Sequence, residues 1–571
     1  MKKAFIIVSI FIFLLFSCAP VQPEKKLRTA KGNVNYGGSL RVNQNHPLIS
    51  LYPHLITDHV SAHIGSHLYE NLVKFDSKDL SILPSIATNW ETDATGTIYT
   101  FTLKKGVFFH DNICFPDGKG RELKASDVKY TFELLCTPGP FNQTFGSTLK
   151  GRLKGADEYY ESSSDEAVKN LPGIKILDDY TIQLILEKPN FSFLYILASP
   201  PMGIIAKEAV GKYGNMLKVG TGPFVYTENN LSDDVILVRN ENYHGTDSLG
   251  NQLPYLDTLK FSFIDSKTEE LKAFQERKID LIIGLPSESV KEVVENHIND
   301  FQKDPPVFIL DRSPELTTHF YEFNTSNSVF KDKKLRQAFS YAIDRNRILN
   351  EVLKGEAFGP GIYGISSPSF EEYDITQING YSYEPDKAKK LLAEAGYPGG
   401  KDFPVIKLVV SAEASRNMAV ALDVSKQIKK VLNIDIDLDI VPYAVNLESS
   451  RFSRGDIIRS AWIADYPSPE SFLSLLYGKP VPKTMDLPSF PNTTRYINPQ
   501  FDSLFESGIS AADKKAANSY FLQAEQMMME DAPLLVLWYD EKYRLYQSNI
   551  RNFYPNPINY WDFSQVYLNK K

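Results

Sequence analysis

The chain has 571 residues, with 62 Lys or Arg against 70 Asp or Glu and a formal net charge of −8. This length exceeds one compact core and predicts two or three domains. The acidic balance, without a basic stripe, argues against nucleic acid as a partner. Aromatic residues make up 12% of the chain, which is generous for lining a large cleft, although some of these rings must build the core.

The N-terminus has the features of an export signal. Lys2 and Lys3 precede an apolar stretch of about a dozen residues, shorter than the roughly 20 that span a bilayer, so residues 1–17 are predicted to be a signal peptide. Leu15-Phe16-Ser17-Cys18 resembles a bacterial lipobox. It implies a protein outside the cytoplasm, periplasmic or extracytoplasmic, anchored to the bilayer of a bacterial cell through a lipid on Cys18. Residues 18–37 are expected to form a flexible tether.

Strand and helix patterns alternate along the rest of the chain. Alternating apolar residues and turn signals predict strands at 37–42, 97–103, 224–227, 236–243, 259–264, 279–282, 406–410, 434–440 and 533–539. Helical spacing predicts helices at 125–132, with Ser126 as N-cap, and at 269–278, 334–345, 386–395, 418–432 and 514–530. A hairpin over 174–186 is expected to turn at Asp178-Asp179. This order predicts an α/β fold.

Histidines and cysteines raise the question of a metal or a disulfide. His59, His63 and His67 are spaced to share one helix face, which can bind a metal or haem iron. No carboxylate or cysteine is placed to complete such a shell, so we interpret these histidines as structural or exposed and expect no metal or cofactor. Cys114 and Cys136 either form a disulfide or remain buried thiols, and the sequence leaves both open.

The segment Ala461-Trp-Ile-Ala-Asp465-Tyr466-Pro467 places one carboxylate among aromatic rings, and its proline restricts the backbone. This combination is typical of a rigid pocket wall that presents one charge, and a strand running into a surface turn is the alternative. Asp465 and Glu470 would be the carboxylate pair of a hydrolase, but a separation of five positions that spans two prolines guarantees no defined distance between the carboxylates. The sequence contains no Gly-x-Ser-x-Gly elbow, His-Glu-x-x-His pair or P-loop, so we expect a binding protein and not an enzyme.

Several segments occur in an order shared with one family. They are Ile86-Ala-Thr-Asn-Trp90-Glu91, 99–107, 125–132, Gly220-Thr-Gly-Pro-Phe224, 335–345, 383–397 and Ala464-Asp465-Tyr466-Pro467. With these segments the sequence resembles the family 5 extracellular solute-binding proteins of ABC importers, the oligopeptide, dipeptide and nickel group, over nearly the whole mature chain. The glycine-rich segment also lacks the lysine of a phosphate loop, and a tight turn is expected there.

The resemblance implies a bilobal venus-flytrap fold with an extra inserted domain. Lobe I would be discontinuous, the extra domain would be inserted into it, and lobe II would follow. The corresponding ranges are 38–65, 193–310 and 535–571 for lobe I, 66–192 for the inserted domain and 311–534 for lobe II. The lobes would close around a solute, and membrane permease subunits would recognise the closed form of a monomer.

The resemblance also implies a set of ligand-binding residues. In the family's peptide binders the aspartate at the position of Asp465 receives the ligand's α-ammonium, and Trp462, Ala464 and Tyr466 would belong to the same wall. His54 and Thr57 match the segment that contacts the ligand from the opposite lobe. Peptide binders can carry a glutamate in that segment, whereas this chain reads Ile56-Thr57-Asp58.

The ligand is expected to be a peptide, and an oligosaccharide, a metal chelate or haem remains the alternative. No clear counterpart is found for arginines that would hold a ligand carboxylate. Arg451, Arg454 and Arg459 are near the Asp465 segment only in sequence.

Overall fold

The computed structural model describes residues 28–162, 170–228, 234–285, 287–326, 329–370, 372–412, 415–511 and 513–569. The predicted signal peptide and Cys18 lie outside these ranges. No helix within the described ranges has both the length and the apolar character needed to cross a membrane.

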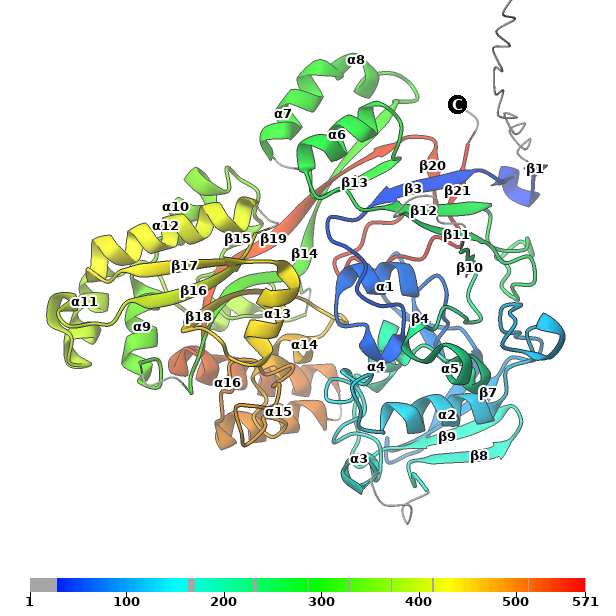
Figure 1. The fold of residues 1–571 in the computed structure, drawn as a ribbon, viewed down its shortest axis with the longest axis horizontal. Coiled ribbons are helices and arrows are strands. Elements are labelled where there is room, and N and C mark those ends of the chain that lie inside the picture. Colours follow the sequence, from blue (N-terminus) through cyan, green and yellow to red (C-terminus); the bar gives the residue numbers. More distant parts are fainter. Residues whose placement is uncertain are drawn as a thin grey trace, which may run out of the picture.

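One mixed sheet of 11 strands runs through both halves of the molecule (Figure 1). Its order is β10-β11-β12-β3-β13-β19-β14-β18-β16-β17, and β15 pairs with β19 off this path. The bounds are β3 Ser39–Asn43, β10 Phe224–Tyr226, β11 Val235–Arg239, β12 Thr258–Ser262, β13 Leu281–Ile283, β14 Phe308–Phe323, β15 Gly359–Pro360, β16 Ile406–Ser411, β17 Ile436–Val441, β18 Ile457–Ile463 and β19 Leu534–Gln547.

Strands β14 and β19 connect the two halves. They pair antiparallel from Phe308↔Gln547 to Glu322↔Leu534, with a register shift between Pro314 and Thr318. One end of β19 pairs with β13, and the later part of β14 pairs with β18. In Figure 1 these two long strands pass from the group around β3 to the group around β16, so they connect the two halves.

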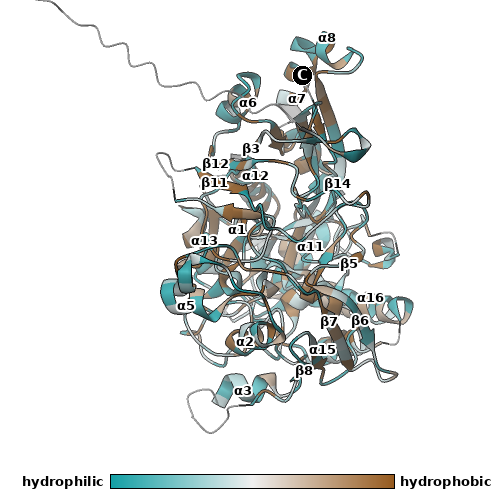
Figure 2. Cartoon of the chain, turned by 90° about the vertical axis from the view of Figure 1, so that its right-hand side faces the viewer, coloured by the Kyte–Doolittle hydropathy of each residue, from teal (hydrophilic) through white to brown (hydrophobic). Residues whose placement is uncertain are grey.

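The helices lie around these strands. The half with β16, β17 and β18 carries α9 (Lys333–Tyr341), α10 (Arg345–Arg347), α11 (Pro385–Glu394), α12 (Ser415–Leu432) and α13 (Tyr443–Arg451). The other elements are β4 Val73–Phe75, β5 Ile82–Pro84, β20 Ile550–Arg551, β21 Tyr567–Leu568, α1 His59–Gly65, α3 Ala156–Ser162, α4 Phe193–Ala198, α5 Lys207–Tyr213, α6 Lys267–Gln275, α7 Ser287–Asn296, α8 Ile298–Phe301, α14 Glu470–Leu473, α15 Pro499–Ile509 and α16 Lys514–Asp531. Figure 2 shows α5 largely hydrophilic at the surface, whereas β11 is largely hydrophobic.

A separate four-stranded sheet forms within residues 66–192. Its order is β6 (Ala87–Thr92), β7 (Ile98–Leu103), β9 (Thr181–Ile185) and β8 (Ile174–Asp178), and α2 (Ala125–Leu135) contacts it at β8. The β8–β9 hairpin confirms the predicted one. The predicted N-cap of α2 is wrong, because the helix begins at Ala125, as predicted, and Lys124, two residues before Ser126, occupies the cap. Asp127 at the third helical position accepts a hydrogen bond from the Lys124 backbone N–H at 2.9 Å, which is one half of a capping box, because a lysine side chain cannot accept the reciprocal bond.

Part of the predicted tether is folded. β1 (Arg28–Thr29) pairs with β2 (Asn35–Tyr36), and Val34 and Tyr36 belong to a small cluster around the buried Tyr255. Residues 28–37 are therefore packed on the body and are not a free linker.

Candidate functional site

A cavity of about 1380 Å³ lies between the two halves. It is lined by residues of β18, by the segment before α1 together with α1 itself, by the start of α12, by α13, by the middle of β19 and by the loop around Phe490. The volume exceeds the 300–1,000 Å³ typical of small-molecule pockets. The cavity therefore has room for an extended solute.

Asp465 presents a carboxylate to this cavity just beyond the end of β18. The ladder continues past the strand, because the Ala464 N–H donates to the Leu316 carbonyl oxygen at 2.8 Å. The Asp465 side chain has exposed surface, but that surface faces the cavity, and protein surrounds the group. Burial raises the pKa of Asp465 to about 7, and a hydrogen bond with Ser471 lowers it only partly. Within the described ranges no Lys, Arg or His forms an ion pair with this carboxylate.

Ser471, in the short helix α14, holds this wall in place. Its hydroxyl oxygen accepts hydrogen bonds from the Asp465 backbone N–H at 2.9 Å and from Trp462 Nε1 at 3.3 Å. Trp462 lies against Phe490, with ring centroids 6.1 Å apart. Sequence reasoning missed Ser471, although its place two residues after Pro469, at the start of a helix, is where a hydroxyl is often presented.

Glu470 has a structural contact instead of a place in the cavity. It starts α14, as expected for an acid at a helix N-terminus, and its side chain is completely buried. Its Oε1 lies 3.2 Å from Nη2 of Arg152. Because Arg152 belongs to the segment 66–192, this buried ion pair ties that segment to α14.

Most of the predicted ligand-contacting residues line the cavity. Asp465, Trp462, Ala464, Tyr466 and Thr57 all do so. The ring of Tyr466 stacks parallel to Tyr195 with centroids 6.1 Å apart. The Thr57 hydroxyl oxygen accepts a hydrogen bond from Arg451 of α13 at 3.0 Å, which connects the two halves beside the cavity.

His54 lies outside the cavity lining. Its side chain is completely buried, its ring packs edge-on against Tyr52, and burial lowers its pKa to about 3. Its carbonyl oxygen accepts hydrogen bonds from Gln143 and Thr144, whereas its ring nitrogens have no hydrogen-bond partner among the described residues. The expectation that His54 contacts a ligand is therefore corrected to a packing role for its ring.

Cationic groups that sequence reasoning left unassigned gather along the same cavity. Arg459 of β18, Arg451 of α13 and Arg416 of α12 line it, together with Lys542 of β19. Arg454 instead pairs with Glu448 on the surface. Strand alternation could have indicated Arg459. It lies six positions before Asp465, and residues an even number of positions apart on a strand face the same side. Arg416 and Lys542 come from distant segments and carried no such signal.

Of the three histidines predicted to share a helix face, His63 and His67 make structural contacts, whereas His59 of α1 lines the cavity. His63 stacks on Trp561 with centroids 3.6 Å apart, and its Nε2 lies 2.9 Å from the Asn559 carbonyl oxygen. His67 contacts the His63 carbonyl oxygen through Nδ1 and accepts a hydrogen bond from the Phe563 N–H through Nε2. No group of three potential metal ligands occurs in the described part of the chain. The sequence left open whether Cys114 and Cys136 form a disulfide or remain thiols. In the structure both are free thiols.

A family model now accounts for this arrangement. The model for bacterial extracellular solute-binding proteins, family 5 (middle), matches residues 81–483. The chain belongs to this family. Family 5 proteins are transport components and not enzymes, so Asp465 and Glu470 are not a catalytic pair, in agreement with the burial of Glu470.

Individual relatives of this family 5 protein extend the match to most of its length. It is 26% identical over 514 residues to the periplasmic oligopeptide-binding protein OppA of Escherichia coli K12, covering 88% of this chain and 87% of that protein. It is 27% identical over 535 residues to heme-binding protein A of Haemophilus influenzae, covering 91% and 90%. The solved structure of the Helicobacter pylori periplasmic binding protein DppA with the peptide STSA has a TM-score of 0.80 at 24% identity, covering 94% of this chain and 99% of that one. The predicted α/β periplasmic-binding-protein fold is thereby confirmed.

Proposed function

We propose that this family 5 protein is the substrate-binding component of an ABC importer and captures a peptide in the cavity between its two halves. The observation that carries the proposal is the Asp465 carboxylate. It faces a large cavity, is surrounded by protein and has no cationic partner among the described residues. A carboxylate that is surrounded by protein and has no cationic partner is solvated less well than in bulk water, so the site favours a ligand that brings a positive group such as a peptide α-ammonium.

The opposite charge of a peptide has a counterpart on the same strand. Arg459 lines the cavity, and within the described ranges it forms no ion pair with a carboxylate. Its Nε is buried without a hydrogen-bond partner. A guanidinium in this position favours a carboxylate on the ligand, because charge-assisted bonds between these groups are the strong ones. Asp465 and Arg459 together support a zwitterionic ligand.

The remaining cavity wall supports peptide over the other solutes. Ser460 and Ala461 line the cavity beside Trp462. Among the described residues β18 pairs with β16 only at its first two residues, so its later part suits pairing with an extended chain whose side chains vary. Haem is the alternative that the Haemophilus influenzae relative keeps open. The histidine nitrogens of His63 and His67 described above are engaged with protein groups, which favours the peptide.

The same proposal includes a lipid anchor and a permease. The lipobox-like segment ending at Cys18 supports attachment to the outer side of a bacterial membrane. Closure of the two halves about β14 and β19 would create the surface that the permease subunits recognise. We further propose the division into lobe I, inserted domain and lobe II at the boundaries given above, with Trp462, Ala464, Asp465, Tyr466 and Thr57 as ligand contacts.

Native mass spectrometry of the purified protein tests the ligand class, because a peptide or haem carried along in the cavity would appear as added mass. Calorimetry with tetra-alanine and N-acetyl-tetra-alanine then tests the role of Asp465. We expect the acetylated peptide to bind at least tenfold more weakly, since it lacks the ammonium. Equal affinity for the two peptides, or a bound haem that excludes them, would overturn the proposal.

A further inference from the structure

Arg459 is held in the cavity wall by neutral groups. Its Nη2 donates a hydrogen bond to Nδ1 of His319 at 2.7 Å and one to the side-chain oxygen of Asn417 at 3.1 Å. Burial, and then the nearby Arg416, lower its pKa to about 10. The positive charge of Arg459 is thus oriented by its neighbours without being neutralised by them.

The contact with Arg459 determines the tautomer of His319. A guanidinium only donates hydrogen bonds, so Nδ1 of His319 must be the unprotonated acceptor. The ring proton is then on Nε2, which donates to Asp540 Oδ2 at 3.0 Å. The 3.5 Å approach of Arg416 to Nε2 is too long to compete with the 2.7 Å bond. The ring of His319 also stacks on Trp538 at 4.1 Å, which limits its rotation.

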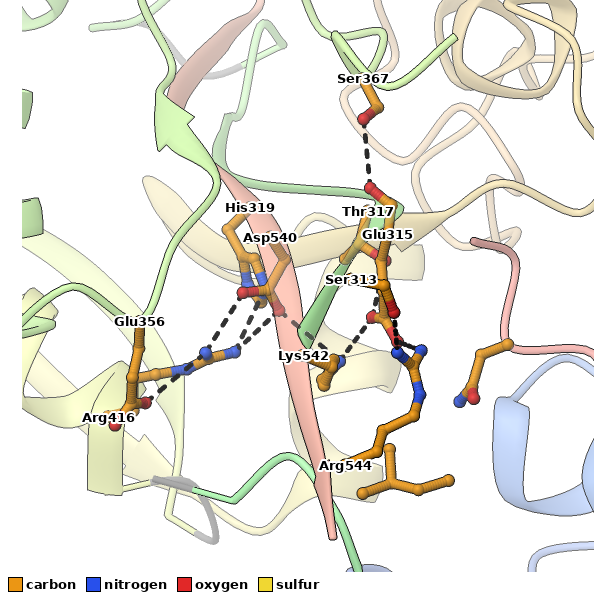
Figure 3. A network of polar contacts seen from close by, with 12 residues as sticks. Ser313, Glu315, Thr317, His319, Glu356, Ser367, Arg416, Asp540, Lys542 and Arg544 are labelled. Carbon is orange, nitrogen blue, oxygen red and sulfur yellow. Dashed lines mark hydrogen bonds and ion pairs between the residues drawn. The ribbon is translucent and has the colours of Figure 1, made fainter. Parts of the chain in front are cut away.

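Asp540 is the fixed end of this chain of contacts (Figure 3). It is completely buried on β19, and Arg416 lies 3.0 Å and Lys542 3.6 Å from its Oδ2. Lys542 in turn pairs with the buried Glu315 of β14 at 2.6 Å. Asp540 is therefore already balanced by two cations, and His319 separates it from Arg459.

We propose that His319 is a positioning residue for ligand recognition, which with Asp540 behind it holds Arg459 toward the cavity as the receptor for the ligand's carboxylate. The inference rests on the proposed function. A carboxylate in place of the imidazole would orient Arg459 equally well but would also pair with it and occupy its charge. A neutral ring with one donor and one acceptor orients the guanidinium and leaves its charge for the ligand. His319 thereby sets the preference for a free acid over an amide.

Calorimetry with tetra-alanine and tetra-alanine amide tests this role in three proteins. The natural chain is expected to prefer the acid by about tenfold or more. His319→Phe keeps a stacking ring but removes both hydrogen bonds, so the acid-to-amide ratio should fall to about threefold or less, while affinity for the amide changes by less than about threefold. His319→Gln retains a donor and an acceptor and should preserve most of the preference.

An unchanged acid-to-amide ratio in folded His319→Phe would overturn the positioning role. A ratio near one in the natural chain would overturn the inference and leave peptide capture standing, whereas failure of both peptides to bind would overturn the proposed function together with it. If His319→Phe does not fold, ¹⁵N NMR of histidine-labelled natural protein decides, with the His319 signals assigned by their loss in His319→Gln. We expect Nδ1 to be unprotonated and Nε2 protonated, and the opposite tautomer would overturn the inference.

Discussion

The raised pKa of Asp465 makes ligand affinity depend on pH. In the ligand-free protein its pKa is about 7, against an ordinary value of 3.8. Ionisation is therefore disfavoured in the folded state, and the contribution of this group to stability falls as the pH rises from about 4 through 7. A ligand ammonium pairs only with the ionised form, so the same rise in pH strengthens binding. The upper limit is the pKa of about 7.7–8.0 at which an α-amino group loses its own proton.

The magnitude follows from the ionised fraction. At a pKa of 7, about half of the Asp465 carboxyls are ionised at pH 7 and about one in a hundred at pH 5, so binding at pH 5 would be weaker than at pH 7 by up to about 50-fold. Because the carboxylate faces cavity water that screens it, we expect at least about tenfold. Calorimetry with tetra-alanine at pH 5, 6 and 7 measures this change, and proton release on binding gives an independent signal in buffers of different ionisation enthalpy.

Two variants separate this effect from a general response to acid. Asp465→Asn should weaken binding at pH 7 by about 2–5 kcal/mol, and its remaining affinity should be nearly constant between pH 5 and 7. Asp437→Asn, at an exposed position on the edge strand β17, is the matched control and should behave as the natural chain. A natural chain whose affinity does not change between pH 5 and 7, or an Asp465→Asn variant with the same pH dependence, would refute the reasoning.

Three further predictions concern the support of the site. Ser471→Ala removes a donor to the cavity carboxylate, so peptide binding at pH 7 should weaken by about 0.5–1.5 kcal/mol in calorimetry; unchanged binding would mean that the hydroxyl does not support the charge. Arg152→Met leaves Glu470 buried and unpaired, so urea unfolding should show a loss of about 3–5 kcal/mol, largely recovered when Glu470→Leu is added. Gly220→Ala places a Cβ 2.1 Å from a backbone oxygen and should cost about 1–3 kcal/mol, whereas Gly211→Ala meets nothing within 4 Å and should be neutral or stabilising; equal urea midpoints for these two would contradict the close approach.

The elements that sequence periodicity predicted well are those with one buried face. Helix α12 and strand β16 lie within a few residues of their expected bounds, because their apolar repeats reflect burial directly. Strand β19 is longer than expected, and its later part carries Asp540, Lys542 and Arg544. These charges suggest a surface to a periodicity argument, yet Asp540 and Arg544 are almost completely buried because they pair with charges from β14 and α12.

The residues of the candidate site also divide into those that the sequence indicated and those that it did not. The Asp465 segment was visible in the sequence because its charge, rings and prolines are adjacent along the chain. The partners of Arg459 were not, since His319 and Asn417 are each more than 40 positions away and meet Arg459 only when three segments come together. His54 matches a contact segment in sequence but does not line the cavity, because nearness to such a segment says nothing about the direction in which a side chain points.

The two proposed ligand charges also share one strand, and this limits what closure of the halves can change. Arg459 and Asp465 are six residues apart on and just beyond β18, so their Cα atoms are about 20 Å apart at a rise of about 3.3 Å per residue. The Ala464 hydrogen bond to β14 keeps this spacing rigid. Bending about β14 and β19 would move the opposite wall toward the ligand and leave these two charges at a fixed separation. Closure would therefore tighten contacts with ligand side chains, whereas the span between ligand termini would be selected by β18 alone.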